Sequence, residues 1–465
     1  MITVVVITFS FRSGFACNRV PRSSSEFLGV PRFLGFLGTD APDELRGTPR
    51  NYTSPVVSSQ STDRRAAYAL AVLTFVNLFN YIDRWVVAAV LEPIKKSLLL
   101  TDTQLGFIGT GFIVVYSLTS PVFGRLGDRR ARPPLIALGV AIWSLATGLA
   151  GFARGFASLF VARAAVGVGE AAYGTIAPAL LSDTFPLERR ARVMSVFFAA
   201  IPIGSAAGYV IGGLADQHFG WRAAFWIAGF PGLLLSVLVL LVTDPPRGQQ
   251  DHGHAPVASG TTLRAIYGDL LRNWPFLRAV LGYAMYTFAL GGLGYWMPAF
   301  LERERGLPRS EATVTFGAIV IVTGFVGTFL GGFLADWLLK RTKQSYLWVS
   351  GVATLLAAPL TFLGLTSPDK PVYLTAIVVA EVLIFMSTGP INSEILSVVS
   401  PEERATAVGL SVLVMHLLGD IPSPPLIGII SDATRLSTAI LVVPVAILVS
   451  GLIWTFAAWK GTRAA

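Results

Sequence analysis

Long apolar stretches separated by short polar breaks run through this chain from residue 66 to residue 460. A helix of about 20 apolar residues is long enough to cross the hydrocarbon core of a bilayer. Six such stretches precede a polar segment that begins at Asp244, and six follow it. We therefore predict an all-α membrane protein with twelve spanning helices, at 66–92, 104–125, 134–152, 157–183, 191–216, 222–243, 276–301, 312–338, 346–365, 371–397, 405–431 and 437–459.

The same breaks predict the domain order. A segment rich in Pro, Ser, Gly and Arg, residues 21–63, is typical of a disordered tail. The expected parts are a cytoplasmic tail, a six-helix bundle, a cytoplasmic linker, a second six-helix bundle and a short tail, at 1–65, 66–243, 244–275, 276–460 and 461–465.

Composition supports a membrane protein and argues against other classes. Hydrophobic residues make up 53% of the chain and charged residues 14%, against about 25% charged residues in soluble proteins. The net charge of +9 comes from Lys and Arg at the ends of apolar stretches rather than from basic patches, so nucleic acid is not an expected partner. Cys17 is the only cysteine, and the chain has no hydrolase or phosphate-binding motif. We expect neither a metal nor an organic cofactor, and no enzyme activity.

The distribution of positive residues predicts the orientation. Lys and Arg are roughly twice as frequent on the side where the first stretch begins as on the other side. Positive residues accumulate on the cytoplasmic side of membrane proteins. Both termini are therefore expected to be cytoplasmic, in a protein of the cell membrane.

The two halves carry similar motifs at matching places. The run Gly124–Arg130 follows the second stretch, and the related run Gly332–Arg341 follows the eighth. Likewise Pro186–Arg189 follows the fourth stretch and Pro401–Arg404 the tenth. Paired motifs in a six-plus-six order are typical of transporters built from two repeats.

Four charged residues lie inside apolar stretches of the first half: Asp83, Arg84, Arg163 and Glu170. A charge at mid-depth of a bilayer costs at least ~2.5 kcal/mol and usually marks function. At ~1.5 Å per residue, Asp83 and Glu170 lie at similar depth, ~27–28 Å from the arginines at the cytoplasmic edge. Two neighbouring acids repel, so one is expected to hold a proton near neutral pH, as a proton carrier requires. The alternatives are structural ion pairs between helices and, for Arg84, contact with a neighbouring helix.

The second half has no charge at the corresponding place, where Gly291 and Gly292 stand. These glycines predict either a binding surface or close helix packing. Prolines after Asp420 are expected to break the eleventh helix, and His416 and Asp420 could bind the freed backbone groups, protons or substrate. The candidate cavity residues are Gly291, Gly292, Tyr295, Trp296, Glu381, His416 and Asp420. A stripe formed by Gly204, Gly208 and Gly212 predicts a packing face.

The repeated Gly-x-x-x-Asp runs resemble the signature of the major facilitator superfamily, over about residues 66–460. The resemblance implies two pseudo-symmetric six-helix bundles around a cavity. It also implies that residues at the cytoplasmic rim latch the bundles together in the outward-open state. The latch residues would be Gly124, Asp128, Arg129, Asp183, Arg189, Asp336 and Arg341.

Four local runs resemble the Spinster family within this superfamily: Asn80–Arg84, Arg163–Ala171, Gly294–Pro298 and His416–Pro424. The resemblance implies a proton-linked carrier of a lysophospholipid or sphingoid phosphate, with Asp83 and Glu170 as the protonatable pair and Arg84 and Arg163 as counter-charges. The short loops and basic tail suggest a bacterial-type member, which we expect to be a monomer. A drug/proton exporter, an organic-anion carrier and a lipid sensor that does not transport are the rival functions.

Overall fold

The computed structural model describes residues 59–247, 263–399 and 404–464. Within these ranges the first half forms eight helices, α1 Ser59–Ala89, α2 Leu91–Leu98, α3 Asp102–Arg129, α4 Arg132–Ala150, α5 Phe156–Thr184, α6 Leu187–Phe219, α7 Trp221–Gly229 and α8 Pro231–Leu240. The second half forms α9 Leu263–Leu270, α10 Trp274–Arg303, α11 Arg309–Leu339, α12 Ser345–Thr366, α13 Lys370–Phe385, α14 Thr388–Ser397, α15 Arg404–Met415, the π-helical segment His416–Asp420, α16 Ser423–Ala433, α17 Leu436–Ala439 and α18 Val442–Ala464.

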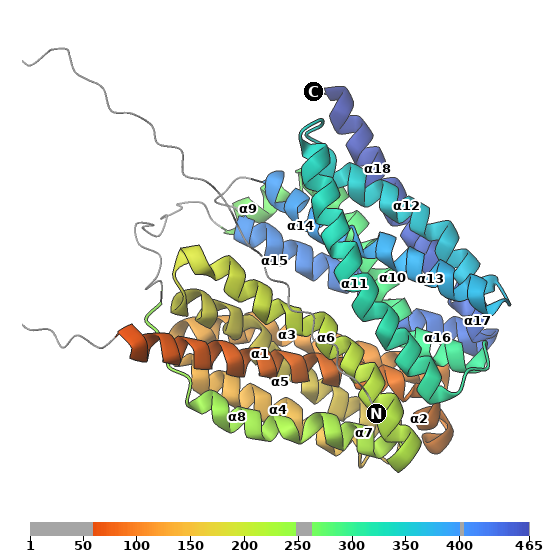
Figure 1. Cartoon of the computed structure of the whole chain (residues 1–465), viewed down its shortest axis with the longest axis horizontal. Coiled ribbons are helices and arrows are strands. Elements are labelled where there is room, and N and C mark those ends of the chain that lie inside the picture. Colours follow the sequence, from red (N-terminus) through yellow and green to blue (C-terminus); the bar gives the residue numbers. More distant parts are fainter. Residues whose placement is uncertain (1–58, 248–262, 400–403, 465) are drawn as a thin grey trace, which may run out of the picture. The chain divides into compact units, whose positions relative to one another are not determined.

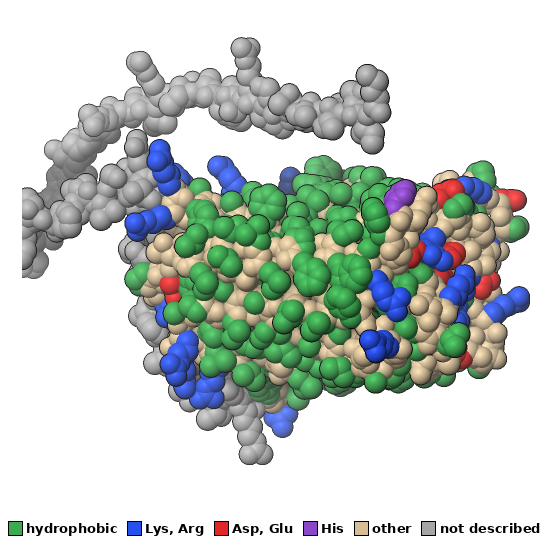
Figure 2. Space-filling view, turned by 90° about the horizontal axis from the view of Figure 1, so that it is seen from below, with side chains coloured by type: hydrophobic (Ala, Val, Ile, Leu, Met, Phe, Trp, Pro, Cys, Tyr) green, Lys and Arg blue, Asp and Glu red, His purple; other side chains and the backbone are tan. Residues whose placement is uncertain are grey.

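Twelve spans in the described ranges are long and apolar enough to cross a membrane. They match the twelve predicted stretches in order, and they form two six-helix bundles (Figure 1). Hydrophobic side chains cover the middle of the face in Figure 2, and charged side chains gather at its two ends. The predicted all-α membrane fold is confirmed.

Some predicted boundaries are wrong because helical structure does not end where apolar character ends. Helix α1 starts at Ser59, before the expected 66, and the chain from Leu91 forms the separate helix α2. The expected linker 244–275 contains α9. The sixth span is divided at Pro231, whose ring removes a backbone N–H and favours the start of a helix. Residues 1–58, most of the expected tail, lie outside the described ranges.

The glycine stripe of α6 packs against α1, as predicted. A Cβ on Gly204 would lie 2.6 Å from the Leu78 carbonyl oxygen, and one on Gly208 would lie 2.7 Å from that of Ile82. Only a residue without a side chain allows the two backbones to approach this closely. The stripe therefore fixes α1, which carries Asp83 and Arg84, in the N-terminal bundle.

The bundles meet at the end that carries α2 and α16, which we call the far end (Figure 1). The other end, where residues 124–130 and 332–341 lie, we call the signature end. At the far end, Gly106 and Gly428 bring α3 and α16 into backbone contact, and Tyr295 of α10 donates a hydrogen bond to the Leu105 carbonyl of α3 at 2.6 Å. At the signature end, a Cβ on Gly124 or Gly332 would meet no atom within 4 Å. The structure is closed at the far end.

Gly428→Ala is expected to open the far end. The new Cβ would lie 2.3 Å from the Asp102 carbonyl oxygen of the other bundle. This distance is too short for two atoms in contact, so the two backbones must move apart. Spin-label distances across the far end should increase, and the thermal unfolding temperature should fall by several degrees. Gly332→Ala is the matched control, because its Cβ meets nothing. Equal effects of the two substitutions would contradict the expectation.

Candidate functional site

The four buried charged residues form two ion pairs, each between α1 and α5. Asp83 accepts hydrogen bonds from Arg163 Nη1 at 2.9 Å and from Thr147 Oγ1 of α4 at 2.5 Å. Arg84 Nε donates to Glu170 Oε2 at 2.7 Å. Both acids are 0% exposed and Arg163 is 1% exposed. Each acid is thus paired with an arginine of the other helix.

Helix geometry explains this crossed pairing. Asp83 and Arg84 are adjacent, so they point about 100° apart around α1. Arg163 and Glu170 lie seven residues apart, about two turns, on one face of α5. Asp83 and Arg84 can therefore contact two residues of α5 that are two turns apart. Contact of Arg84 with a neighbouring helix was one of the two alternatives, and the structure shows such a contact, with Glu170.

A cavity of about 110 Å³ adjoins these pairs on the side of the C-terminal bundle. Both arginines line it, whereas neither acid does. The sequence predicted that all four side chains lie in or near one vestibule. The structure places the two arginines at the cavity wall and the two acids next to them, each bonded to one guanidinium group. The lining residues are Arg84, Trp85, Val87, Gly109, Phe112, Ile113, Tyr116, Arg163, Gly291, Tyr295, His416, Asp420 and Pro424.

Aromatic rings surround the Arg84 guanidinium. Its Cζ lies 5.0 Å from the ring centroids of Tyr81 and Tyr116 and 5.1 Å from that of Phe112. The cation is attracted to the negative faces of the rings. These contacts stabilise the charge of Arg84 without using the hydrogen-bond donors that an anionic ligand would need.

Two polar atoms of the ion pairs have no hydrogen-bond partner among the described residues: Arg163 Nε and Glu170 Oε1. Buried polar atoms normally have partners, so each exception needs an explanation. At these two atoms the ion pairs retain one unused donor, Arg163 Nε, and one unused acceptor, Glu170 Oε1.

The C-terminal bundle supplies the other wall of the cavity. His416 Nδ1 lies 2.9 Å from Asp420 Oδ1, and both side chains line the cavity together with Gly291 and Tyr295. The two residues bound the π-helical segment that precedes the prolines. Short π-helical segments are frequent at functional sites.

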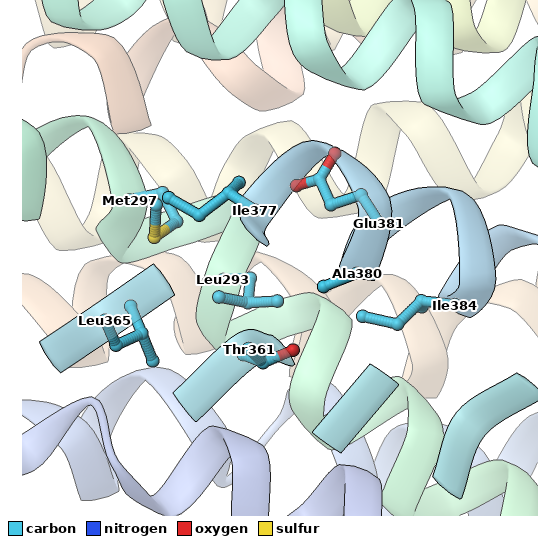
Figure 3. Close-up of a pocket in the computed structure, with 8 residues that line it drawn as sticks. All are labelled: Leu293, Met297, Thr361, Leu365, Ile377, Ala380, Glu381 and Ile384. Carbon is cyan, nitrogen blue, oxygen red and sulfur yellow. The ribbon is translucent and has the colours of Figure 1, made fainter. Parts of the chain in front are cut away.

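Three predicted cavity residues lie elsewhere. Trp296 is fully buried and donates its Nε1 hydrogen to the Pro424 carbonyl oxygen at 3.1 Å. Gly292 packs against Ile427 and Val443, as the close-packing alternative predicted. Glu381 borders a separate, much smaller cavity inside the C-terminal bundle (Figure 3).

The backbone group freed by the proline break has a partner in the other bundle. Proline at position 425 has no N–H, which frees the Ile421 carbonyl from its helical partner. Thr110 of the N-terminal bundle donates a hydrogen bond to this carbonyl at 2.6 Å. His416 and Asp420 bind each other instead. Nothing in the local sequence identified Thr110, because it lies 311 residues away.

An ionic network at the far end was not predicted. Arg303 of α10 donates to both carboxylate oxygens of Asp102, at 2.6 and 2.7 Å, and pairs with Glu92. Asp432 of α16 accepts the backbone N–H groups of Asp102 and Thr103, both at 2.8 Å. Burial raises the pKa of Glu92 above its usual value, and Arg303 offsets part of the rise. In the sequence, these charged residues only appeared near the ends of apolar stretches. Together they connect the two bundles.

The predicted latch residues lie at the signature end. Asp128, Arg129, Arg189, Asp336 and Arg341 are exposed, with the Arg341 guanidinium 4.3 Å from the Trp337 ring centroid. Asp183 pairs with Arg132 of the same bundle at 2.5 Å, and Gly124 has open space beside it. Residues 400–403 lie outside the described ranges. The latch between the two bundles stays a prediction.

Comparisons with known proteins agree with this architecture. The Major Facilitator Superfamily model matches residues 73–424. The chain is 36% identical over 416 residues to "Protein spinster homolog 3" of Danio rerio, covering 86% of this chain and 82% of the relative. It is 38% identical over 392 residues to "Protein spinster homolog 1" of Homo sapiens, covering 80% and 74%.

A solved structure is similar as well. It is described as a bacterial homolog to the human lysosomal transporter Spinster, in inward-facing and unoccupied conformation. The TM-score is 0.78 at 25% identity, covering 86% of this chain and 98% of the other. The chain therefore belongs to the Spinster family of the major facilitator superfamily, and it is a membrane transporter.

Proposed function

We propose that this chain is a proton-coupled secondary transporter that moves an amphipathic lipid with an anionic headgroup by alternating access. The observation that carries the proposal is the crossed pairing of two buried carboxylates with two arginines that line the cavity. Intramembrane ion pairs of this kind are costly and generally serve transport.

The pairing supports a link between proton and substrate. An anion bound from the cavity would share the positive charge of Arg84 with Glu170, and it would so weaken the electrostatic stabilisation of the Glu170 carboxylate. A carboxylate that loses its cationic partner takes up a proton more readily. Linkage is reciprocal, so protonation of Glu170 in turn frees Arg84 for the anion. Proton and anionic headgroup would thus bind together.

The cavity lining supports an amphipathic substrate. Arg84 and Arg163 offer charged donors suited to phosphate or carboxylate. Trp85, Val87, Phe112 and Ile113 offer apolar surface for a hydrocarbon chain. A lysophospholipid or sphingoid phosphate fits this division. An organic anion without a long tail would bind the same arginines. Transport assays with a panel of lipids and tail-free anions distinguish these two substrate classes.

The positive residues support a cytoplasmic signature end, with both termini on that side and the protein in the cell membrane. The far end, closed in this structure, then faces outward. We propose that this conformation is the inward-open state of a monomeric carrier. The signature latch would form when the bundles rock to the opposite state.

Arg84→Gln is expected to weaken binding of a lysophospholipid by roughly 10–100-fold. A hydrogen bond to a charged group contributes about 1.5–3 kcal/mol, and each 1.4 kcal/mol corresponds to a factor of ten. Titration with native mass spectrometry measures the bound fraction, and counterflow in proteoliposomes measures exchange. Binding without counterflow in the wild type would favour a lipid sensor.

Arg222→Gln is the matched control. Arg222 also lies over an aromatic ring, 4.3 Å from the Trp221 centroid, but it does not line the cavity. Equal losses in the two variants would contradict a headgroup role for Arg84.

A further inference from the structure

One buried carboxylate in the C-terminal bundle is not used by the proposed mechanism. Glu381 of α13 is 6% exposed, and its Oε2 lies 2.9 Å from Thr323 Oγ1 of α11. No lysine, arginine or histidine among the described residues forms an ion pair with it. The phenols of Tyr209 and Tyr286, on other helices, interact electrostatically with Glu381. These hydroxyls bond to the Gly294 carbonyl and to Thr388, respectively.

The hydrogen-bond count around Thr323 determines which group donates. Thr323 Oγ1 also lies 2.7 Å from the Ile319 carbonyl oxygen. A hydroxyl has one hydrogen to donate, and a carbonyl oxygen can only accept. If Glu381 were ionised, two acceptors would face one hydrogen. A protonated Glu381 satisfies both contacts, because it donates to Thr323 while Thr323 donates to Ile319.

The surroundings of Glu381 favour the neutral acid. The adjoining cavity holds only about 10 Å³ and is lined mainly by apolar side chains, among them Leu293, Met297 and Ile377. In Figure 3 the Glu381 side chain lies beside these apolar side chains, on the same helix as Ile377. A buried charge without a partner is strongly unfavourable in such a place.

The helix α11 also packs closely against α13 and the residue after it. A Cβ on Gly327 would lie 2.5 Å from the Val382 carbonyl oxygen, and one on Gly331 would lie 2.0 Å from that of Met386. Both glycines follow Thr323 along α11, at spacings of one and two turns. The backbone contact beside the carboxyl group is therefore tight.

We propose that Glu381 is a proton-binding site of the C-terminal bundle, occupied in this conformation, and that it donates a hydrogen bond to Thr323. The site is separate from the Asp83 and Glu170 pairs of the other bundle. In this conformation the transporter then carries a bound proton at a position outside the substrate cavity.

Infrared difference spectroscopy of the full-length protein at neutral pH tests the proposal. The wild type minus Glu381→Gln spectrum should contain the carbonyl stretch of a protonated carboxylic acid. Thr323→Val removes the acceptor and should shift this band. Thr361→Val is the matched control, because Thr361 lines the same small cavity but donates to the Ala357 carbonyl. It should leave the band in place.

Thermal unfolding of each variant provides a second measurement. Glu381→Gln should retain wild-type stability, because a neutral amide can replace a neutral acid as donor to Thr323. A difference spectrum with only carboxylate bands would overturn the proposal. So would a band that Thr323→Val leaves unshifted, or that Thr361→Val shifts equally.

Discussion

Asp83→Asn is expected to reduce proton-driven uptake at least tenfold and to remove its dependence on pH. The amide keeps the shape of the carboxyl group but cannot bind the proton or balance Arg163. Removing one partner of a fully buried ion pair costs about 3–5 kcal/mol. The cost should be smaller here, because the amide oxygen of the variant can still accept a hydrogen bond from Arg163 Nη1, which also lies 3.4 Å from the backbone carbonyl oxygen of residue 83. The variant should therefore fold, and uptake in proteoliposomes with an imposed pH gradient measures its loss of coupling.

Glu311→Gln is the matched control for this substitution. Glu311 pairs with Lys370, but the two side chains are 45% and 53% exposed. Exposed pairs contribute about 0–1 kcal/mol, so uptake and its pH dependence should be unchanged. Proton-driven uptake that survives in Asp83→Asn would show that Asp83 does not couple transport.

Arg303→Ala is expected to shift the protein away from the state closed at the far end. The substitution leaves two carboxylates, Asp102 and Glu92, with 3% and 5% side-chain exposure and without their main cationic partner. In the open state water can solvate both acids. A loss of about 3 kcal/mol, the lower value for breaking a buried pair, corresponds to a population shift of roughly 100-fold.

Spin-label distances measure this shift. Cys17 is the only cysteine, so one substitution provides a cysteine-free background. Labels at Leu99 and Arg435, both exposed and in different bundles, report the separation at the far end. Lys96→Ala is the control, since Lys96 contacts Glu302 at only 3.8 Å and is 69% exposed. An unchanged distance distribution in Arg303→Ala would mean that the network does not hold this end closed.

The twelve spans were predictable because each needs only a run of apolar residues, which the chain itself displays. Their order and the repeated motifs then indicated two bundles. The helix breaks were harder to predict. A division at Pro231 or a π-helical segment at His416 depends on how neighbouring helices satisfy the backbone, which a single segment does not reveal.

The four charged residues of the site were predictable from their cost in a membrane, but their pairing and exposure were not. Pairing of Asp83 with Arg163 depends on the rotation of α1 against α5. The glycine stripe of α6 helps to set that rotation through its contact with α1. Thr110 and the far-end network were missed for a related reason: each joins residues from the two bundles that lie far apart in sequence and carry no local motif.

Coupling of protons to substrate through the α1–α5 ion pairs is the central step of the proposed mechanism. The most direct test records proton movement in proteoliposomes when a lysophospholipid or a sphingoid phosphate is added, with no imposed gradient. We expect substrate-induced proton flux in the wild type and none in the double variant Asp83→Asn, Glu170→Gln. Substrate transport by the wild type without proton movement, or equal proton flux in the double variant, would contradict this mechanism.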